Sequence, residues 1–263
     1  MAIVGFIGTG NMGGALARAA AKSGRTERLL LSNRSIEKAR TLAVELGGEA
    51  RSNQEVAARA DYLFLGVKPQ LLEGMLDGIR QTLTARRDRF VIVSMVAGKD
   101  LAELHRLLGE ETPIIRMMPN IPVQVGGGVT LYCASKQVTE EEKQTFCELL
   151  RASGMVTELD EHLLDAASGV TGCGPAFAAM FVEALADGAV ACGLPRKQAI
   201  AYGAQMVLGT AKLLLETGEH PDALKDRVCS PGGSTIQGVR KLEERAFRSA
   251  VTDAVIAAFE KDF

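Results

Sequence analysis

Two glycine-rich stretches, one near each end of the 263-residue chain, could bind anions through their backbone. The first, Gly8-Thr9-Gly10-Asn11-Met12-Gly13, directly follows an apolar run at the N-terminus. The second, Ser230-Pro231-Gly232-Gly233-Ser234-Thr235, precedes a helical pattern. The free N–H groups and the dipole at a helix start favour phosphate or carboxylate groups. The sequence therefore predicts two anion sites.

The first stretch fits the G-x-G-x-x-G pattern in the strand–turn–helix context that dinucleotide binding requires. Gly8 permits a tight turn, Gly10 lets the backbone approach the diphosphate, and Gly13 lets the helix pack on the strand. A plain strand–turn–helix unit is the alternative, since glycine is common. We expect a dinucleotide cofactor, in contact with Ile7, Gly8, Thr9, Gly10, Asn11 and Met12.

The segment after the second expected strand favours one dinucleotide over the other. An NAD site usually carries an acid about 20 residues after the glycines, which binds the ribose hydroxyls. Here the chain reads Ser32-Asn33-Arg34-Ser35, and the next acid is Glu37. An acid would repel the 2′-phosphate of NADP, whereas arginine and small polar donors would bind it. We therefore expect NADP(H), with NADPH preferred over NADH; a merely solvated Arg34 is the alternative.

Two more segments should reach the carboxyl edge of the sheet, where open α/β sheets bind ligands. Gly66-Val67-Lys68-Pro69 follows one strand, and Val96-Ala97-Gly98 follows the next. Lys68 could contact the nicotinamide ribose or attract a carboxylate substrate. The small residues Ala97 and Gly98 would let the cofactor lie close to the backbone.

Alternating strand and helix patterns predict a doubly wound, mostly parallel sheet. The expected strands are nearly continuous in apolar residues, as strands buried on both faces should be; they cover residues 3–7, 28–32, 62–67, 90–95, 113–117 and 129–133. After a short run at 155–159 the pattern is only helical, with helices expected to open near Pro175 and to cover 196–216, 235–244 and 247–263. We expect a Rossmann domain over 1–159 and an all-α domain over 160–263.

Composition narrows the class of protein further. The net charge of −2 gives no basic field for nucleic acid or an anionic membrane. Five scattered cysteines without a CxxC pair and three histidines favour neither a disulfide framework nor a metal site. The N-terminus does not read as a signal peptide, and glycines and Pro175 interrupt the uncharged stretch 166–182, unlike a membrane span. We expect a cytoplasmic protein.

The helical half is rich in small residues between Ala178 and Ala191 that would let helices pack closely. Such a domain could complete its core with a second subunit, and an ordinary bundle within one chain has about equal weight. The stretch at 230–235 also has a simpler interpretation, a capped turn with Ser234 or Thr235 as the N-cap. A cap that binds a ligand is compatible with both interpretations.

Several motifs together resemble the pyrroline-5-carboxylate reductase family, over nearly the whole chain. They are Ile7-Gly8-Thr9-Gly10-Asn11-Met12, Val67-Lys68-Pro69, Arg116-Met117-Met118-Pro119-Asn120-Ile121-Pro122, Gly172-Cys173-Gly174-Pro175-Ala176-Phe177 and Asp226-Arg227-Val228-Cys229-Ser230-Pro231-Gly232-Gly233-Ser234-Thr235. The resemblance implies reduction of 1-pyrroline-5-carboxylate to L-proline with NAD(P)H, the last step of proline biosynthesis. It also implies a Rossmann domain followed by a helical dimerisation domain, in dimers that often assemble into decamers of five dimers.

The resemblance also implies roles for individual residues. Asn53 and the pair Asn33-Arg34 would lie at the adenosine end of the cofactor, with Val67, Lys68, Pro69, Ala97 and Gly98 near the nicotinamide. Ser230, Gly233 and Ser234 would bind the substrate carboxylate. Thr235 would contact the ring nitrogen across the dimer and, with Lys68, serve catalysis.

Some positions depart from the family pattern, and two other functions remain open. Thr171, Cys173 and Phe177 stand where Ser, Ser and Tyr are common, and Ile121 where Thr is frequent, which leaves room for a changed substrate preference. One rival is an NADP-dependent hydroxyacid dehydrogenase with a catalytic lysine, for which Lys197 is the obvious candidate. The other rival is a non-catalytic nucleotide-sensing protein that keeps the fold.

Overall fold

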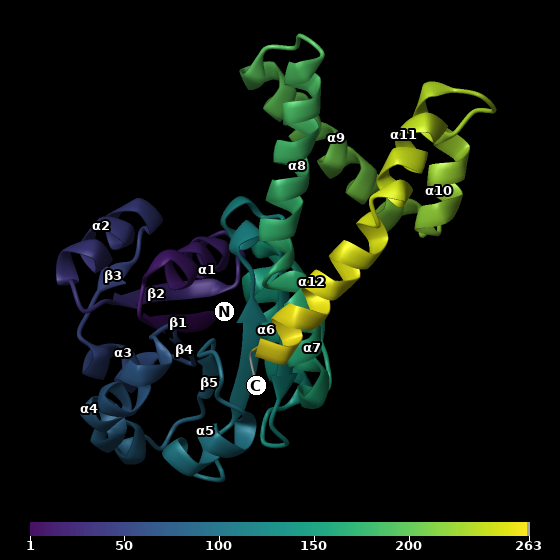
Figure 1. Ribbon diagram of the computed structural model, residues 1–263. Helices are drawn as coiled ribbons and strands as arrows, with labels where there is room; N and C mark the ends of the chain where they lie inside the picture. Colours follow the sequence, from purple (N-terminus) through teal and green to yellow (C-terminus); the bar gives the residue numbers. More distant parts are fainter. Residues whose placement is uncertain (262–263) are drawn as a thin grey trace. The chain divides into compact units, whose positions relative to one another are not determined.

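The computed structural model describes residues 1–261 and divides into two compact units, Met1–Gly172 and Cys173–Lys261. The first unit is built on a sheet, and the second is helical (Figure 1). The last two residues of the helix expected at 247–263 lie outside the described residues.

The sheet unit is built on eight strands, counted over the described residues, in the order β3-β2-β1-β4-β5-β6-β7-β8. Only the pairing of β6 with β7 is antiparallel in this sheet. The bounds are β1 (Ala2–Ile7), β2 (Thr26–Ser32), β3 (Glu49–Ala50), β4 (Tyr62–Leu65), β5 (Val91–Ser94), β6 (Ile114–Pro119), β7 (Gly128–Ala134) and β8 (Gly154–Glu158). The chain reverses its direction of progress across the sheet between β1 and β4, which is where such folds bind ligands.

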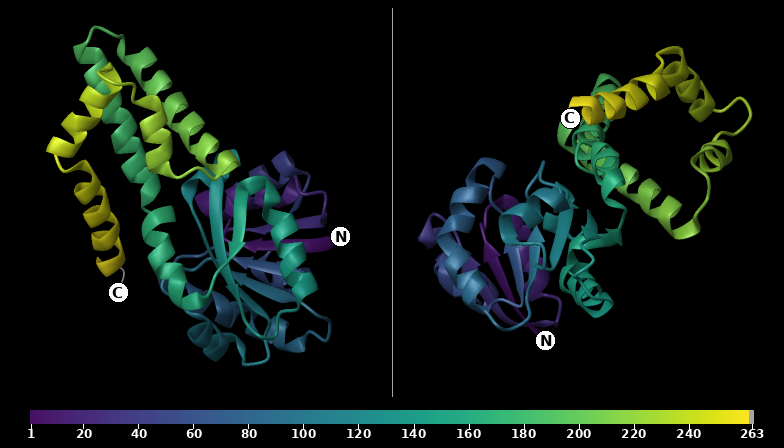
Figure 2. Two further views of the ribbon diagram at one scale, coloured as in Figure 1. Left: turned by 90° about the vertical axis from the view of Figure 1, so that its right-hand side faces the viewer. Right: turned by 90° about the horizontal axis from the view of Figure 1, so that it is seen from below.

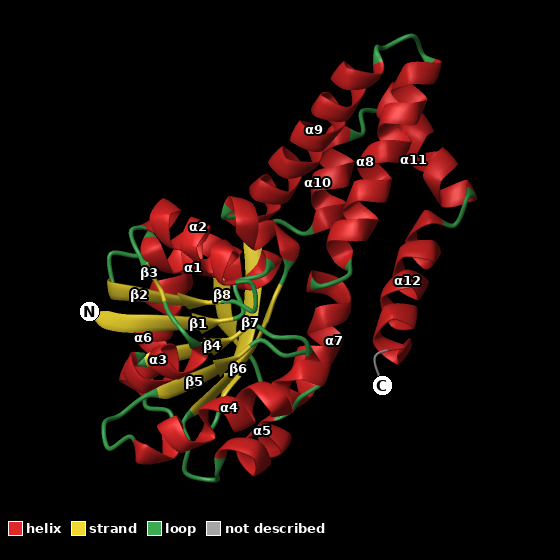
Figure 3. Ribbon diagram, turned by 90° about the vertical axis from the view of Figure 1, so that its left-hand side faces the viewer, coloured by secondary structure: helices red, strands yellow, loops and turns green. Residues whose placement is uncertain are grey.

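Helices cover both faces of this sheet (Figure 3). One face packs against α1 (Asn11–Ala21), α2 (Ile36–Leu46) and α6 (Glu140–Leu150), and the other against α3 (Asn53–Arg59), α4 (Leu72–Ala85) and α5 (Leu101–Leu108). Helix α7 (Glu161–Thr171) packs on β7 through Leu164, which is fully buried against Leu131 and Cys133. Short 3₁₀ turns lie at Pro69–Leu71, Ile121–Val125 and Arg151–Ser153.

Buried side chains explain why these strands form. Val4 and Phe6 of β1 point into one core and Ile7 into the other, so the strand is apolar on both sides, as a central parallel strand should be. Phe6 stacks on Phe64 of β4 with ring centroids 4.4 Å apart. These contacts hold the carboxyl ends of β1 and β4 together at the point where the direction reverses.

The helical unit contains α8 (Gly174–Ala191), α9 (Arg196–Thr217), α10 (Pro221–Val228), α11 (Ser234–Glu244) and α12 (Phe247–Lys261). Helices α8 and α9 lie side by side (Figure 2). Between residues 173 and 260, only Ala186, Ala199 and Leu224 are buried. Large apolar side chains are exposed instead; Leu208 is 62% exposed and Met180 is 68% exposed. The unit has little core of its own.

The expected elements are largely confirmed. The six expected strands match β1, β2 and β4 to β7, with ends that shift by up to two residues, and β8 covers most of the run at 155–159. The helices expected at 196–216 and 235–244 form at Arg196–Thr217 and Ser234–Glu244, and Pro175 lies in the first turn of α8. Strand β3 was missed because two residues carry no periodicity.

The compact sheet unit extends to Gly172, beyond the expected boundary at 159. The reason is α7, whose acidic side chains Glu161 and Asp165 pair with Arg116 of the sheet. The segment Glu161–Ala191 is long and apolar enough to cross a membrane by composition. It is divided near Gly172 into α7 and α8, and these helices belong to different units.

Candidate functional site

The glycine turn joins β1 to α1 at the point where the sheet reverses direction. Gly8 has a φ of 99°, and a Cβ there would overlap the carbonyl group of Gly66. A Cβ on Gly13 would overlap the carbonyl oxygen of Gly8. Position 10 differs, because a Cβ there would meet no atom within 4 Å. The fold itself requires Gly8 and Gly13, whereas the open space at Gly10 suits close approach by a ligand.

Side chains at the end of β2 form a polar network beside this turn. The Ser32 hydroxyl donates a 2.6 Å hydrogen bond to Oδ1 of Asn53, the first residue of α3. The Asn33 amide donates to the Thr9 hydroxyl at 3.1 Å, and its own Oδ1 accepts from the backbone N–H of Ser35 at 3.0 Å. Three separate segments are thereby joined at one sheet edge, and the predicted positions 9, 33 and 53 lie together.

One of the cationic side chains that follow β2 makes no ion pair with any described residue. Arg34 is exposed and has no ion pair or hydrogen-bond partner in the part of the chain that is described. Glu37, the nearest acid in sequence, is held instead by Arg40 at 2.6 Å. The Ser35 side chain precedes α2 without capping it, so the first N–H groups of this helix have no side-chain acceptor. This surface is suited to a phosphate group.

A cavity of about 670 Å³ adjoins the glycine turn. Thr9, Gly10 and Asn11 line it together with further residues of α1 and α2, including Lys38, and with Gln124 of the turn at Ile121–Val125. Arg18 and Glu45 also line it and pair at 2.6 Å, and the Arg18 guanidinium lowers the pKa of the Glu45 carboxyl. Because that carboxylate already has a cationic partner, it adds little repulsion for an anion at the turn.

The segments after β4 and β5 reach the same edge of the sheet. Strand β4 ends at Leu65, two residues earlier than expected, although the N–H of Gly66 still donates to the carbonyl oxygen of Ile7 at 2.8 Å. Lys68 then precedes the Pro69–Leu71 turn, exposed and without an ion pair to any described residue. Ala97 and Gly98 are exposed as well, and Gly98 has a φ of 67°.

The second glycine-rich stretch opens α11 of the helical unit. Gly233 is the N-cap, and no side chain caps the helix, so the expectation of Ser234 or Thr235 as N-cap is wrong. A Cβ on Gly233 would overlap the Ser230 hydroxyl, and Gly232 has a φ of 70°. Ser230, Ser234 and Thr235 are exposed. The first N–H groups of α11 therefore remain free of side-chain acceptors beside three hydroxyls, as a carboxylate site requires.

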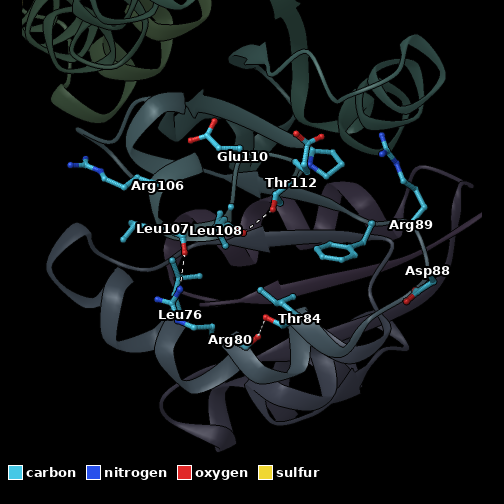
Figure 4. Close-up of a pocket in the computed structure, with 15 residues that line it drawn as sticks. Leu76, Arg80, Thr84, Asp88, Arg89, Arg106, Leu107, Leu108, Glu110 and Thr112 are labelled. Atoms are coloured by element: carbon cyan, nitrogen blue, oxygen red, sulfur yellow. Dashed lines mark hydrogen bonds between the residues drawn. The ribbon is translucent and has the colours of Figure 1, made fainter.

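Another cavity, of about 710 Å³, lies at the opposite edge of the sheet (Figure 4). Asp88, Arg89 and Phe90, which precede β5, and Thr112 and Pro113, which precede β6, are among its lining residues. It is remote from the carboxyl edge, where the glycine turn and Lys68 lie. Residues 1–261 hold no cluster of three His, Cys, Asp or Glu side chains suited to a metal ion.

The arrangement has features that sequence reasoning missed. The hydrogen bonds Ser32–Asn53 and Asn33–Thr9 join segments more than 20 residues apart, and no local sequence pattern predicts them. The burial of Arg116 and Asn120 and their bonds to α7 were not expected either. The signal available was the type of residue, since a polar side chain within an apolar strand needs a partner.

A glycine turn at the point where a doubly wound sheet reverses direction, followed by a separate helical unit, defines a Rossmann-type dinucleotide-binding oxidoreductase. Residues 3–98 match the family model described as NADP oxidoreductase coenzyme F420-dependent, and residues 161–262 match the one described as pyrroline-5-carboxylate reductase dimerisation. The chain belongs to the pyrroline-5-carboxylate reductase family.

Relatives of known identity resemble the whole chain. The pyrroline-5-carboxylate reductase of Escherichia coli strain K12 is 43% identical over 261 residues, covering 98% of this chain and 96% of that protein. The Plasmodium falciparum pyrroline carboxylate reductase with NADP bound is 31% identical with a TM-score of 0.86, covering 99% and 97% of the two chains. The Coxiella burnetii enzyme is 28% identical with a TM-score of 0.92, covering 99% and 97%.

Proposed function

We propose that this chain reduces 1-pyrroline-5-carboxylate to L-proline with a reduced nicotinamide dinucleotide, the last step of proline biosynthesis. The observation that carries the proposal is the presence of two uncapped anion sites of different kinds in one chain. The glycine turn suits a diphosphate, and the Gly233 opening of α11 suits a carboxylate. The E. coli relative, similar over its full length, supports this substrate.

The cofactor would be held by residues of the sheet unit. The open space at Gly10 fits the diphosphate, with Ile7, Gly8, Thr9, Asn11 and Met12 around it. Asn33, Arg34 and Asn53 would bind the adenosine end, and Val67, Lys68, Pro69, Ala97 and Gly98 the nicotinamide end. The unpaired Arg34 favours NADPH over NADH, because its charge would otherwise face no partner in residues 1–261.

The chemistry needs orientation more than a strong acid. When bound, the dinucleotide supplies a hydride to the imine carbon, while the C=N electron pair moves to the protonated nitrogen. Ser230, Gly233 and Ser234 would bind the substrate carboxylate, and the Thr235 hydroxyl would hold the ring nitrogen. Lys68, at the sheet edge, would attract the anionic substrate and contact the nicotinamide ribose. Orientation of this kind contributes several kcal/mol to catalysis, of order 7–11 kcal/mol in well-aligned systems.

We also propose that the chain acts as a cytoplasmic homodimer, with a decamer of five dimers as its larger assembly. The exposed apolar side chains of α8 and α9 and the match to a dimerisation model support the dimer. In a dimer, Thr235 would act on substrate held with the partner subunit. The five cysteines of the described chain are all free, as in a reducing compartment.

One assay tests the proposal. NADPH oxidation is followed with pyrroline-5-carboxylate, beside NADH and beside a hydroxyacid with NADP⁺. We expect turnover with the imine and a higher kcat/KM for NADPH than for NADH. Turnover with the hydroxyacid alone would overturn the proposal in favour of a dehydrogenase using Lys197, which is exposed in the first turn of α9. NADPH binding without any turnover would favour a nucleotide-sensing protein.

A further inference from the structure

The last residues of β6 and those that follow it, Arg116 to Pro122, take no part in the site proposed above, yet two polar side chains there are buried. Arg116 is 3% exposed and Asn120 is 8% exposed. Burial of such groups is unfavourable unless their hydrogen bonds are made. Each side chain makes bonds of this kind to the same helix, α7, from positions four residues apart.

Arg116 holds the beginning of α7. Its guanidinium pairs through Nη1 with Glu161 at 3.1 Å and through Nη2 with Asp165 at 3.0 Å. Glu161 also accepts a 2.8 Å hydrogen bond from the backbone N–H of Leu101, which opens α5. The first turns of α7 are therefore tied to both the sheet and a neighbouring helix.

Asn120 holds the other end of α7. Its Nδ2 donates a 2.9 Å hydrogen bond to the carbonyl oxygen of Thr171, the last residue of the helix. Its Oδ1 accepts from the backbone N–H of Val129 at 2.8 Å, which fixes the amide against β7. The last carbonyls of a helix have no partner within it, so this amide supplies one of the missing donors.

The spacing along the two elements agrees with these contacts. Residues 116 to 120 of an extended strand span about 13 Å at roughly 3.3 Å per residue. Residues 161 to 171 of a helix span about 15 Å at 1.5 Å per residue. The segment 116–120, which runs from β6 to the residue after it, therefore contacts α7 near its beginning and at its end.

We propose that Asn120 is a positioning residue for imine reduction. Helix α7 is the last element of the sheet unit, and the chain enters the helical unit at Cys173, two residues after Thr171. By fixing the last turn of α7, Asn120 fixes the point from which the chain leaves the unit that holds the cofactor. The inference rests on the proposed function, in which the helical unit carries the substrate carboxylate site. A misplacement of about 1 Å can lower a rate by roughly a hundredfold.

The variant Asn120→Asp isolates this contact. The new carboxylate keeps the acceptor for Val129 but sets an oxygen, in place of a donor, against the Thr171 carbonyl. We expect kcat for the imine to fall by about tenfold or more, with the Kd for NADPH unchanged. The control is Tyr62→Phe, which removes a 3.0 Å hydrogen bond to the Glu142 carbonyl in the same unit and should leave kcat unchanged.

Amide hydrogen exchange supplies a measurement that does not depend on turnover. In Asn120→Asp we expect faster exchange at Gly172, whose N–H donates to Ser168 at 2.7 Å, and unchanged exchange in α6. Asp165→Asn, in the first half of α7 and partly exposed, should lower kcat in the same way and serves if Asn120→Asp does not fold. It retains an acceptor oxygen while losing the charge.

The outcomes separate the two proposals. A wild-type chain that does not reduce pyrroline-5-carboxylate would overturn the proposed function. With an active wild type, an unchanged kcat in both Asn120→Asp and Asp165→Asn, or an equal loss of kcat in Tyr62→Phe, would overturn the positioning role alone. A loss of kcat confined to Asn120→Asp and Asp165→Asn, with NADPH binding retained, would support it.

Discussion

Gly8 and Gly66 meet backbone to backbone, and neither position has room for a Cβ beside the other's carbonyl oxygen. This contact joins the carboxyl ends of β1 and β4, and Gly10 and Asn11 at the start of α1 are exposed. The glycines of the turn therefore have two different roles, one in the fold and one in ligand binding. Gly8 and Gly13 serve the fold, whereas Gly10 leaves space for a ligand.

These two roles predict opposite effects of two alanine variants on the melting temperature and on the Kd for NADPH. Gly10→Ala should unfold at nearly the wild-type temperature, because its Cβ meets nothing within 4 Å, while its Kd for NADPH rises clearly. Gly8→Ala should lower the melting temperature, since it combines a positive φ with a clash against Gly66. Calorimetry and NADPH fluorescence titration measure both. Unchanged NADPH affinity in Gly10→Ala would remove the turn from the cofactor site.

Arg34 should distinguish NADPH from NADH. Replacement by alanine removes a charged donor that has no other described partner, so the Kd for NADPH should rise by about tenfold, or 1.4 kcal/mol. The Kd for NADH should not change. Arg40→Ala is the matched control, because Arg40 already pairs with Glu37. Equal losses for both dinucleotides would place Arg34 away from the 2′-phosphate.

Thr235 should affect turnover and not cofactor binding. Thr235→Ala removes the hydroxyl proposed to hold the ring nitrogen and should lower kcat by about 10²-fold, as the loss of one oriented donor does elsewhere. Thr235→Ser keeps the hydroxyl and should retain most of the activity. Steady-state kinetics beside NADPH titration measures both. Wild-type kinetics in Thr235→Ala would exclude it from the site.

The exposed apolar surface of α9 should mediate self-association. Leu208 is 62% exposed and lines a cavity together with Met180, so Leu208→Glu should convert dimers to monomers in sedimentation experiments. Val44→Glu is the control, since Val44 is 86% exposed on α2 of the sheet unit. If both variants sediment as the wild type does, the interface lies elsewhere.

The buried thiol of Cys133 should lower the free energy of unfolding of the chain at high pH. Burial raises the pKa of its thiol from 9.0 to about 12, so the folded chain keeps this proton when the unfolded chain loses it. The stabilisation is complete below pH 9 and declines as the pH rises toward 12. The free energy of unfolding, measured with urea from pH 8 to 11, should fall less steeply in Cys133→Ala.

In the native chain, exposed Cys192 should react with thiol reagents before Cys133.

Local signals were sufficient for much of the fold. Thr139 and Glu142 form a capping box at the start of α6, and Pro175 lies in the first turn of α8 as expected. These features depend on residues within one turn of each other, so the sequence contains them directly. The same holds for the position of the glycine turn between β1 and α1.

Contacts between distant segments could not be predicted in this way. The bonds from Asn33 to Thr9 and from Asn120 to Thr171 join residues 24 and 51 positions apart. Ser234 and Thr235 are common N-cap residues, yet Gly233 takes that place because the chain turns at Gly232 with a positive φ. Tertiary packing, rather than local preference, decides such positions.

Because few residues of the helical unit are buried, its stability should depend on the concentration of the protein. Residues 173–260 bury only Ala186, Ala199 and Leu224, so the interface of the proposed dimer would supply most of the apolar burial that stabilises this unit. Its melting temperature should then rise with protein concentration, while that of the sheet unit stays fixed. At low expression, the helical unit, which we propose to bind the substrate carboxylate, would be the first part of the chain to unfold.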